Sequence, residues 1–338
     1  MRGLSMELLC CEMNHLITKQ ALSKYEKGLM QPKANVLESL CKVLKVPKAY
    51  FYAQEEVVIG GINFRSEARL AVQASEQMIS TAQDKIERYL KIEDLLAIPS
   101  CFVNPINNLK IVSTENLEQA AERIRYKWNL GSTPIFSVYE MLESVGVKII
   151  EFEAGTPDII GFSTLINKSI PLIVINLTAN HTTERKRFTA LHELGHLLLN
   201  FDKEIEGRQI EKYCNLFAGA ILCPSTVLYR ELGYRRTSLT MNELISLKNR
   251  YGISIAAAVH RAKDLNIISE RHYNEIFNHH IHENKMESGW GAYPIEEHTD
   301  RFERLLQRAI AEGVIDGEEL AVMAHDSGES YIKTIKIL

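Results

Sequence analysis

Apolar side chains recur every three to four positions over long stretches of this chain, which is the spacing of one buried face of a helix. After Pro32 the pattern predicts an amphipathic helix that stops at Val46-Pro47 and has apolar positions at Val36, Leu37, Leu40, Cys41, Val43 and Leu44. A long helix with one polar face is expected over residues 66–97, before Pro99. Further helices are expected over residues 115–129, 135–145, 241–250 and 254–265. These patterns predict a mainly α-helical protein.

Residues 1–52 have the organisation of a small helical module. A helix is expected to begin near Ser5, and a second one to run from about Thr18 to Gly28, because glycine commonly follows the end of a helix. The amphipathic helix after Pro32 completes the module. Residues 53–109 predict a linker that includes the long helix, since its first residues combine two acids, a short apolar run and two glycines.

The end of the chain differs in character from what precedes it. Residues 289–294 predict a turn-rich break, and an extension over residues 285–338 is expected to contain helices at 301–312 and 316–324 and a final strand at 331–338. Just before this extension lie His279, His280 and His282. We interpret this cluster as an exposed loop rather than as a second metal site.

The charge of the chain is unevenly distributed. Its 338 residues are enough for two or three domains, and their formal net charge is −4. Residues 1–52 contain eight Lys or Arg and four acids, so this segment carries about +4 and the rest about −8. A basic module on an acidic chain indicates a polyanionic partner such as nucleic acid.

The sequence lacks the signals of membrane insertion or secretion. No apolar run approaches 18 residues, so we expect no transmembrane helix and no membrane partner. The N-terminus has no basic segment followed by an apolar one, so no secretion signal is expected. The six cysteines show no C-x-x-C spacing and several lie in apolar helical contexts, which favours reduced thiols. A cytoplasmic location is therefore expected.

Five residues, His192-Glu193-Leu194-Gly195-His196, form the pattern H-E-x-x-H inside a run of helical character. Because positions i and i+4 lie on one face of a helix, both imidazoles can reach a single metal ion. Glu193 lies on the same side, where its carboxylate can reach a water molecule without being a ligand. A zinc hydrolase needs ligands, a position for water and a base in this arrangement. The alternative is a buried helix with two histidines at this spacing by chance, and the residues downstream argue against it.

A catalytic zinc ion usually takes a third protein ligand, and the candidates are Asp202, Glu204, Glu206 and Glu211. Residues 211–224 are expected to form the next helix, with an apolar stripe through Cys214, Phe217, Ala218 and Ile221. Glu211 falls on this stripe, where a carboxylate is costly unless it is paired or binds metal. The other three acids lie in a polar turn, where solvated charges are ordinary. Glu211 is therefore the preferred third ligand.

These residues carry a resemblance to a known family. Residues 185–189 read Arg-Lys-Arg-Phe-Thr before the H-E-x-x-H pattern, and residues 211–224 read E-x-x-C-N-x-F-A-x-x-I-L-x-P. The whole resembles the ImmA/IrrE family of metallo-endopeptidases over about residues 110–270. The resemblance implies one Zn²⁺ per chain, with His192, His196 and Glu211 as its ligands and Glu193 as the general base. It also implies a small sheet before the active-site helix, formed by residues 149–152, 161–163 and 170–176.

The N-terminal module resembles an Xre/Cro-type helix-turn-helix. The resemblance rests on S-K-Y-E-K-G-x-x-x-P at residues 23–32, followed by L-x-x-L-x-x-x-L-x-V-P at residues 37–47. It implies a recognition helix at about residues 18–27, with DNA groove and phosphate contacts from Thr18, Lys19, Gln20, Ser23 and Lys24. Such modules open with one more helix before Arg2. The first helix is therefore expected to be missing here, which would leave apolar surface open.

Together these observations predict a mainly α fold with a small β-sheet (α+β). The expected order is a helix-turn-helix module over residues 1–52, a linker and long helix over 53–109, a zincin-like metallopeptidase domain over 110–275 and a C-terminal helical extension over 285–338.

The implied activity is zinc-dependent hydrolysis of a peptide bond in a regulatory protein. In the resembling family the substrate class is a helix-turn-helix repressor, whose cleavage controls transcription in a stress response or a mobile element. Glu193 would take the proton from the attacking water and hand it to the leaving amine. The sequence offers several candidates for stabilising the oxyanion, which are Tyr213, Tyr229, His260 and Arg261.

The alternative is a DNA-binding transcriptional regulator or antitoxin-like protein whose metallopeptidase-like domain binds or senses without cleaving. Glu193 favours the enzyme, because a pure binding site would not need a base. The expected partners are a protein substrate, double-stranded DNA and a second copy of the chain in a homodimer.

Overall fold

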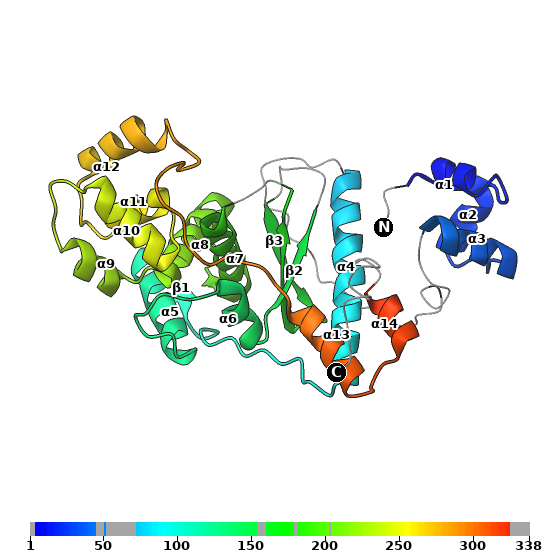
Figure 1. Ribbon diagram of the computed structural model, residues 1–338. Coiled ribbons are helices and arrows are strands. Elements are labelled where there is room, and N and C mark those ends of the chain that lie inside the picture. Colours follow the sequence, from blue (N-terminus) through cyan, green and yellow to red (C-terminus); the bar gives the residue numbers. More distant parts are fainter. Residues whose placement is uncertain are drawn as a thin grey trace. The chain divides into compact units, whose positions relative to one another are not determined.

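The computed structural model describes residues 4–44, 51, 72–153, 160–178, 182–202 and 204–324 (Figure 1). The chain divides into two compact units. Unit 1 comprises Met1–Val57, Leu70–Pro99 and Asp300–Leu338, and unit 2 comprises Val58–Arg69 and Ser100–Thr299. The prediction of a mainly α protein with a small sheet is confirmed.

The N-terminal module of unit 1 consists of three short helices, α1 (Met6–Glu12), α2 (Lys19–Glu26) and α3 (Ala34–Leu44). Ser5 and Thr18 cap the first two helices, since each side-chain oxygen accepts a hydrogen bond from a backbone N–H three residues later. The three helices share a small apolar core of Leu9, Cys10, Met13, Ile17, Leu22, Val36 and Leu40.

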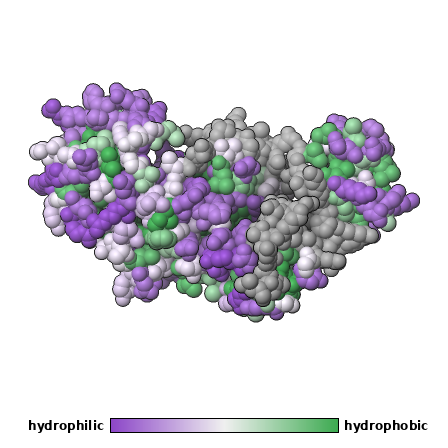
Figure 2. All heavy atoms as spheres, viewed as in Figure 1, coloured by the Kyte–Doolittle hydropathy of each residue, from purple (hydrophilic) through white to green (hydrophobic). Residues whose placement is uncertain are grey.

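Large apolar side chains are also exposed on this module. Leu29 is 73% exposed, and Leu8, Leu16 and Met30 are exposed as well. In Figure 2 hydrophobic and hydrophilic residues lie side by side on the surface of the module. Among the described residues, no helix has both the length and the apolar character that crossing a membrane requires.

The remaining helices of unit 1 are α4 (Val72–Leu95), α13 (Arg301–Ala311) and α14 (Gly317–Met323). The first of these lies within the predicted long helix, of which residues 66–71 are outside the described residues. Tyr89 of α4 stacks on Phe302 of α13, with ring centroids 5.9 Å apart. The expected strand at 331–338 lies outside the described residues.

Unit 2 contains the sheet that precedes the central helix. Its strands are β2 (Lys148–Phe152), β3 (Gly161–Ile166) and β4 (Ile170–Asn176), in the order β2-β4-β3. β2 runs parallel to β4, and β3 runs antiparallel to it, with Ser163 opposite Ile173. Two short segments, β1 (Lys110–Ile111) and β5 (Asn200–Phe201), pair in parallel elsewhere in the unit.

Helices build the rest of unit 2. They are α5 (Thr114–Lys127), α6 (Val138–Ser144), α7 (Thr183–Leu198), α8 (Gly207–Leu222), α9 (Ser225–Leu232), α10 (Met241–Tyr251), α11 (Ile255–Asp264) and α12 (Glu270–Ile276). α7 packs against β3 and β4 and also against α8, so it is the central helix of the unit (Figure 1). α7 and α8 contribute to one large apolar core with α5, α6, α10 and α11.

A close approach of α7 and α8 depends on Gly195. A Cβ at this position would lie 3.1 Å from Cys214 Sγ and 3.2 Å from Phe217 Cδ1, which is tighter than ordinary contact. Glycine usually weakens a helix interior. Here it lets the two helices that carry the predicted metal ligands pack closely.

A non-helical segment, residues 284–299, crosses unit 2 and is fixed by buried acids; we call it the acidic strap. Glu287 accepts hydrogen bonds from the backbone N–H groups of Ile255 and Ala256 at the start of α11, and it pairs with Lys248 at 2.9 Å. Glu297 accepts hydrogen bonds in the same way at the start of α6, from the backbone N–H groups of residues 138 and 139.

The acidic strap is tied to α7 through a buried arginine. Arg187 and Glu297 form an ion pair at 2.5 Å, and both side chains are fully buried. The Arg187 guanidinium also donates to the carbonyl oxygens of Ile135 and Gly252 and lies 4.3 Å from the centre of the Tyr293 ring. The ion pair therefore fixes the helix that bears the H-E-x-x-H pattern to a segment that lies 110 residues further along the chain.

Candidate metal centre

The two histidines of the H-E-x-x-H pattern lie on one face of α7. His192 Nε2 and His196 Nε2 are 3.1 Å apart, and the ring centroids are 4.9 Å apart. The helix is continuous from Thr183 to Leu198 and begins with Thr182 as its N-cap. The i, i+4 spacing therefore brings both imidazole nitrogens to one point beside α8.

α8 brings Glu211 to the same point. Its Oε2 lies 3.2 Å from His192 Nε2, and its Oε1 lies 3.4 Å from His196 Nε2. In the part of the chain that the structure describes, these three residues are the one group of three side chains with metal-binding atoms close together. Asp202, Glu204 and Glu206 precede α8 and are outside this group.

The three side chains fit a zinc ion. Two nitrogen ligands at zinc-binding distance in a tetrahedral site would be about 3.3 Å apart, close to the observed separation of the two Nε2 atoms. Glu211 Oε1 is buried and makes no hydrogen bond of good geometry. A buried carboxylate oxygen of this kind is costly unless a cation or a donor meets it. The donor set of two imidazoles and one carboxylate suits zinc.

Neighbouring residues orient the imidazoles. His192 Nδ1 lies 2.8 Å from Asn215 Oδ1, and His196 Nδ1 lies 3.6 Å from Cys214 Sγ. A proton on Nδ1 of His192, donated to Asn215, leaves Nε2 free as a ligand. Asn215 is a contact that sequence reasoning missed, although it stands in the matching stretch after Glu211.

The electrostatics of the cluster keep the carboxylate ionised. Burial alone would raise the pKa of the Glu211 carboxyl, but the adjacent imidazoles of His192 and His196 outweigh it and lower that pKa to about 2. Burial also opposes the charged form of His192, yet the hydrogen bond to Glu211 and the nearby charge of Glu193 raise the pKa of this imidazole. Both shifts have the same cause, which is the attraction between the imidazoles and the carboxylates beside them.

Glu193 is held by a serine from the sheet. Ser163 Oγ on β3 donates a hydrogen bond of 2.7 Å to Glu193 Oε2. Both residues are half-buried. The sequence gives no signal for this contact, because a serine on a strand 30 residues earlier is ordinary until the fold places it beside α7.

Three of the four candidates for oxyanion stabilisation have partners. Arg261 pairs with Glu118 and donates to Cys223 O, and Tyr229 Oη donates to Leu265 O. His260 contacts Tyr273 Oη at 3.1 Å. Tyr213 is buried in the core. Nothing in these contacts singles out one of the four.

The residues predicted to contact DNA lie on α2 and its N-cap. Thr18 uses its hydroxyl to cap the helix, and Lys19 Nζ forms an ion pair with Glu7 at 2.5 Å, with both side chains exposed. Gln20 and Lys24 are exposed, and Ser23 is half-buried. The histidines at positions 279, 280 and 282 are exposed as expected, although residues 277–281 form a π-helical turn rather than a loop.

The fold and the site are those of a metallopeptidase-like domain in a chain that also contains a small helix-turn-helix module. Residues 142–263 match the model of the IrrE N-terminal-like domain, a peptidase family, and residues 1–51 match the helix-turn-helix model. The chain therefore contains an IrrE-like peptidase domain and an N-terminal helix-turn-helix, as the resemblance predicted. The matched peptidase region includes all of β2 to α8. No curated protein matches the chain.

Proposed function

We propose that this protein is a zinc-dependent endopeptidase that cleaves a regulatory protein. The observation that carries this proposal is the convergence of His192, His196 and Glu211, with Glu193 beside them and hydrogen-bonded to Ser163. A peptidase-type family match over residues 142–263 supports it.

In this proposal the residues of the site have two separate roles, metal binding and proton transfer. His192 and His196, through Nε2, and the Glu211 carboxylate would hold one zinc ion. When bound, zinc would lower the pKa of water and polarise the scissile carbonyl. Glu193 would accept the proton of the attacking water and donate it to the leaving amine.

The proposed substrate is a helix-turn-helix repressor, whose cleavage would release transcription in a stress response or a mobile element. The fused helix-turn-helix at residues 1–51 supports this substrate class, because such a module could bring the peptidase to the same operator or to the repressor itself. A cytoplasmic location follows for a protein with this partner, and the six free cysteines agree with it. The homodimer stays a prediction.

Metal content and cleavage test the proposal together. We expect about one zinc ion per chain in the purified wild type, retention of zinc in Glu193→Gln, and its loss in His192→Ala and Glu211→Ala. Glu204→Ala is the matched control, because Glu204 lies outside the cluster and should keep the metal. A folded wild type without bound metal would contradict the site.

Cleavage is then measured on purified helix-turn-helix repressors from the same genome, by intact mass. The wild type should cut at least one of them at a defined bond, and Glu193→Gln should cut none. Cleavage that persists in Glu193→Gln would remove this residue from the role of base.

A second candidate function is DNA-binding regulation in which the metal domain senses without cutting. The exposure of Gln20 and Lys24 on α2 supports it, since a recognition helix must present such side chains to the major groove. This function does not require Glu193 as a base, so the Glu193→Gln variant would behave as the wild type in a DNA-dependent assay.

A further inference from the structure

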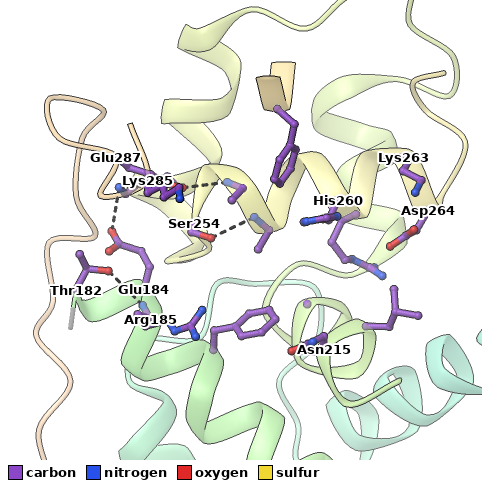
Figure 3. A pocket seen from close by; sticks show the side chains of 18 of the residues that line it. Thr182, Glu184, Arg185, Asn215, Ser254, His260, Lys263, Asp264, Lys285 and Glu287 are labelled. Carbon is purple, nitrogen blue, oxygen red and sulfur yellow. Dashed lines mark hydrogen bonds and ion pairs between the residues drawn. The ribbon is translucent and has the colours of Figure 1, made fainter. Parts of the chain in front are cut away.

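A pocket of about 850 Å³ adjoins the metal centre within unit 2. It lies between α7 and α8 on one side and α11 on the other, and Figure 3 shows Arg185 and Asn215 on the side opposite His260 and Asp264. Its volume is in the range of pockets that bind a ligand or a short peptide segment.

Two residues connect the pocket to the metal centre. Asn215 lines the pocket and contacts His192 Nδ1 at 2.8 Å. Phe188 lines it as well and lies one helical turn before His192 on the same face of α7. The pocket and the metal centre are therefore neighbours along α7 and α8, and Asn215 contacts both.

The charges that line the pocket do not cancel. The acids Glu184 and Glu287 are engaged by Lys248, at 3.9 and 2.9 Å, and by backbone N–H groups. Arg261 is paired with Glu118. Glu184 and Glu287 are therefore already paired and would not bind a cationic ligand.

Uncompensated positive charge remains in the lining. Among the described residues, three cations of the lining form no ion pair with a carboxylate, and these are Arg185, Lys212 and Lys285. Lys263 pairs with the exposed Glu270 at 3.3 Å, a contact that solvent weakens. Asp264 is the one remaining acid of the lining. Burial raises the pKa of its carboxyl and the charges of Lys212, Lys263 and Arg261 lower it, so Asp264 offsets part of their charge. An anionic group entering the pocket would therefore meet several cations and few acids.

The pocket also has an apolar part. Phe188, Leu216 and Phe277 line it, with Ala256 and Ala257 on α11. On α8 the cationic Lys212 lies one turn before the apolar Leu216, and both line the pocket. The lining thus suits a segment that carries both acidic and apolar side chains.

We propose that this pocket binds an acidic segment of the protein substrate next to the cleaved bond, with carboxylates at Arg185 and Lys212 and an apolar side chain against Phe188 and Leu216. The proposal rests on the proposed peptidase function and adds the chemistry of the substrate to it. A peptide is favoured over a separate small ligand because the pocket shares Asn215 with the metal centre.

Peptide binding tests the pocket without requiring cleavage. The probe is a fluorescein-labelled Glu-Phe-Glu-Ala-Glu-Phe hexapeptide, with a matched probe in which glutamine replaces each glutamate. Fluorescence anisotropy is measured on the zinc-loaded Glu193→Gln protein, so that the probe stays intact. The pocket variant adds Arg185→Gln and Lys212→Gln. The control variant adds Arg123→Gln and Lys127→Gln, two exposed residues of α5 that do not line the pocket.

The glutamate probe should bind about tenfold more tightly than the glutamine probe, which is the size expected for one charged hydrogen bond. The pocket variant should bring this ratio close to one, and the control variant should leave it unchanged. A ratio near one in the parent protein, or an unchanged ratio in the pocket variant, would overturn the proposal. Tighter binding of ATP than of the glutamate probe would overturn the choice of a peptide.

Failure of the proposed function gives a different result. In that case the glutamate probe would still bind in a charge-dependent way, while the wild type would cleave no repressor. Cleavage of a repressor whose cut site has no acidic residues nearby, at a rate that the pocket variant of the active protein does not change, would overturn the inference and leave the peptidase intact.

Discussion

At the scale of single residues, the position of Glu193 depends on Ser163. The carboxylate of a general base must face the reacting water, and a free glutamate on a helix surface samples several rotamers. The hydrogen bond of 2.7 Å from Ser163 Oγ restricts it to one of them. In the proposed mechanism Ser163 therefore acts through Glu193, as a positioning residue on the strand next to the helix.

Replacing Ser163 by alanine should lower the turnover number about tenfold with little change in KM, because the base is less often in position. Ser163→Thr keeps the hydroxyl and should recover most of the loss. The rate constants are measured on a cleaved repressor, with zinc content measured in parallel. Ser169→Ala, in the exposed turn after β3, is the control. Equal turnover in Ser163→Ala and wild type would remove this role.

At the scale of elements, α7 is positioned from both sides. Gly195 lets it approach α8, which carries Glu211, and Arg187 ties it to the acidic strap. A buried ion pair contributes little beyond a matched apolar pair, but the loss of one partner leaves an uncompensated charge in the interior. Glu297 also accepts hydrogen bonds from Ser137 and from two N–H groups at the start of α6, so its removal affects two helices.

Glu297→Ala should lower the free energy of unfolding of unit 2 by about 3 kcal/mol. Urea unfolding followed by tryptophan fluorescence measures it, because both tryptophans of the chain, Trp128 and Trp290, lie in unit 2. Glu296→Ala, at the exposed neighbouring position, is the control and should change little. The double variant with Arg187→Met should lose less than the sum of the two single variants, since it removes the stranded charge as well. Additive losses would argue against a coupled pair.

At the scale of the whole molecule, a helix-turn-helix module and a metallopeptidase-like domain share one chain. The N-terminal module carries its own core and the net positive charge of residues 1–52, whereas unit 2 contains the metal centre. The DNA binding proposed for this module would be governed by phosphate contacts and would therefore depend on salt.

Lys19→Ala combined with Lys24→Ala should weaken binding to a 20-base-pair duplex and reduce the slope of log K against log salt by about one to two. Lys19 must exchange Glu7 for a phosphate, so Lys24 is expected to account for more of the change. The binding constant is measured by anisotropy over a range of salt concentrations. Lys42→Ala on α3 is the control. An unchanged slope of log K against log salt would contradict the assignment of α2 as the recognition helix.

The helices and the small sheet were predictable because apolar periodicity and the resemblance act locally. The helix expected at 115–129 is observed at Thr114–Lys127, and the one expected at 254–265 is observed at Ile255–Asp264. The expected ligand Glu211 stands where the apolar stripe of α8 placed it, beside both histidines. Its role as a ligand stays a prediction.

Contacts across long stretches of sequence were not predictable in this way. Ser163 meets Glu193 only because β3 packs on α7, and Glu297 meets Arg187 across 110 residues. From the sequence, Glu287 and Glu297 of the acidic strap look like ordinary surface acids in a turn-rich segment, because nothing in their local pattern indicates a buried partner. The cationic pocket likewise depends on which acids are already paired, and pairing is a property of the folded chain.

The acidic strap has a consequence for the order in which the protein is made. The N-terminus of a chain leaves the ribosome first, and domains generally fold as they emerge. The helix-turn-helix module can close its core when its own residues have emerged, but Arg187 has no carboxylate partner until residue 297 has left the exit tunnel. During synthesis the helix-turn-helix module can thus fold well before α7 gains the ion pair that holds it, so the proposed peptidase activity would have to wait until residue 297 has been made.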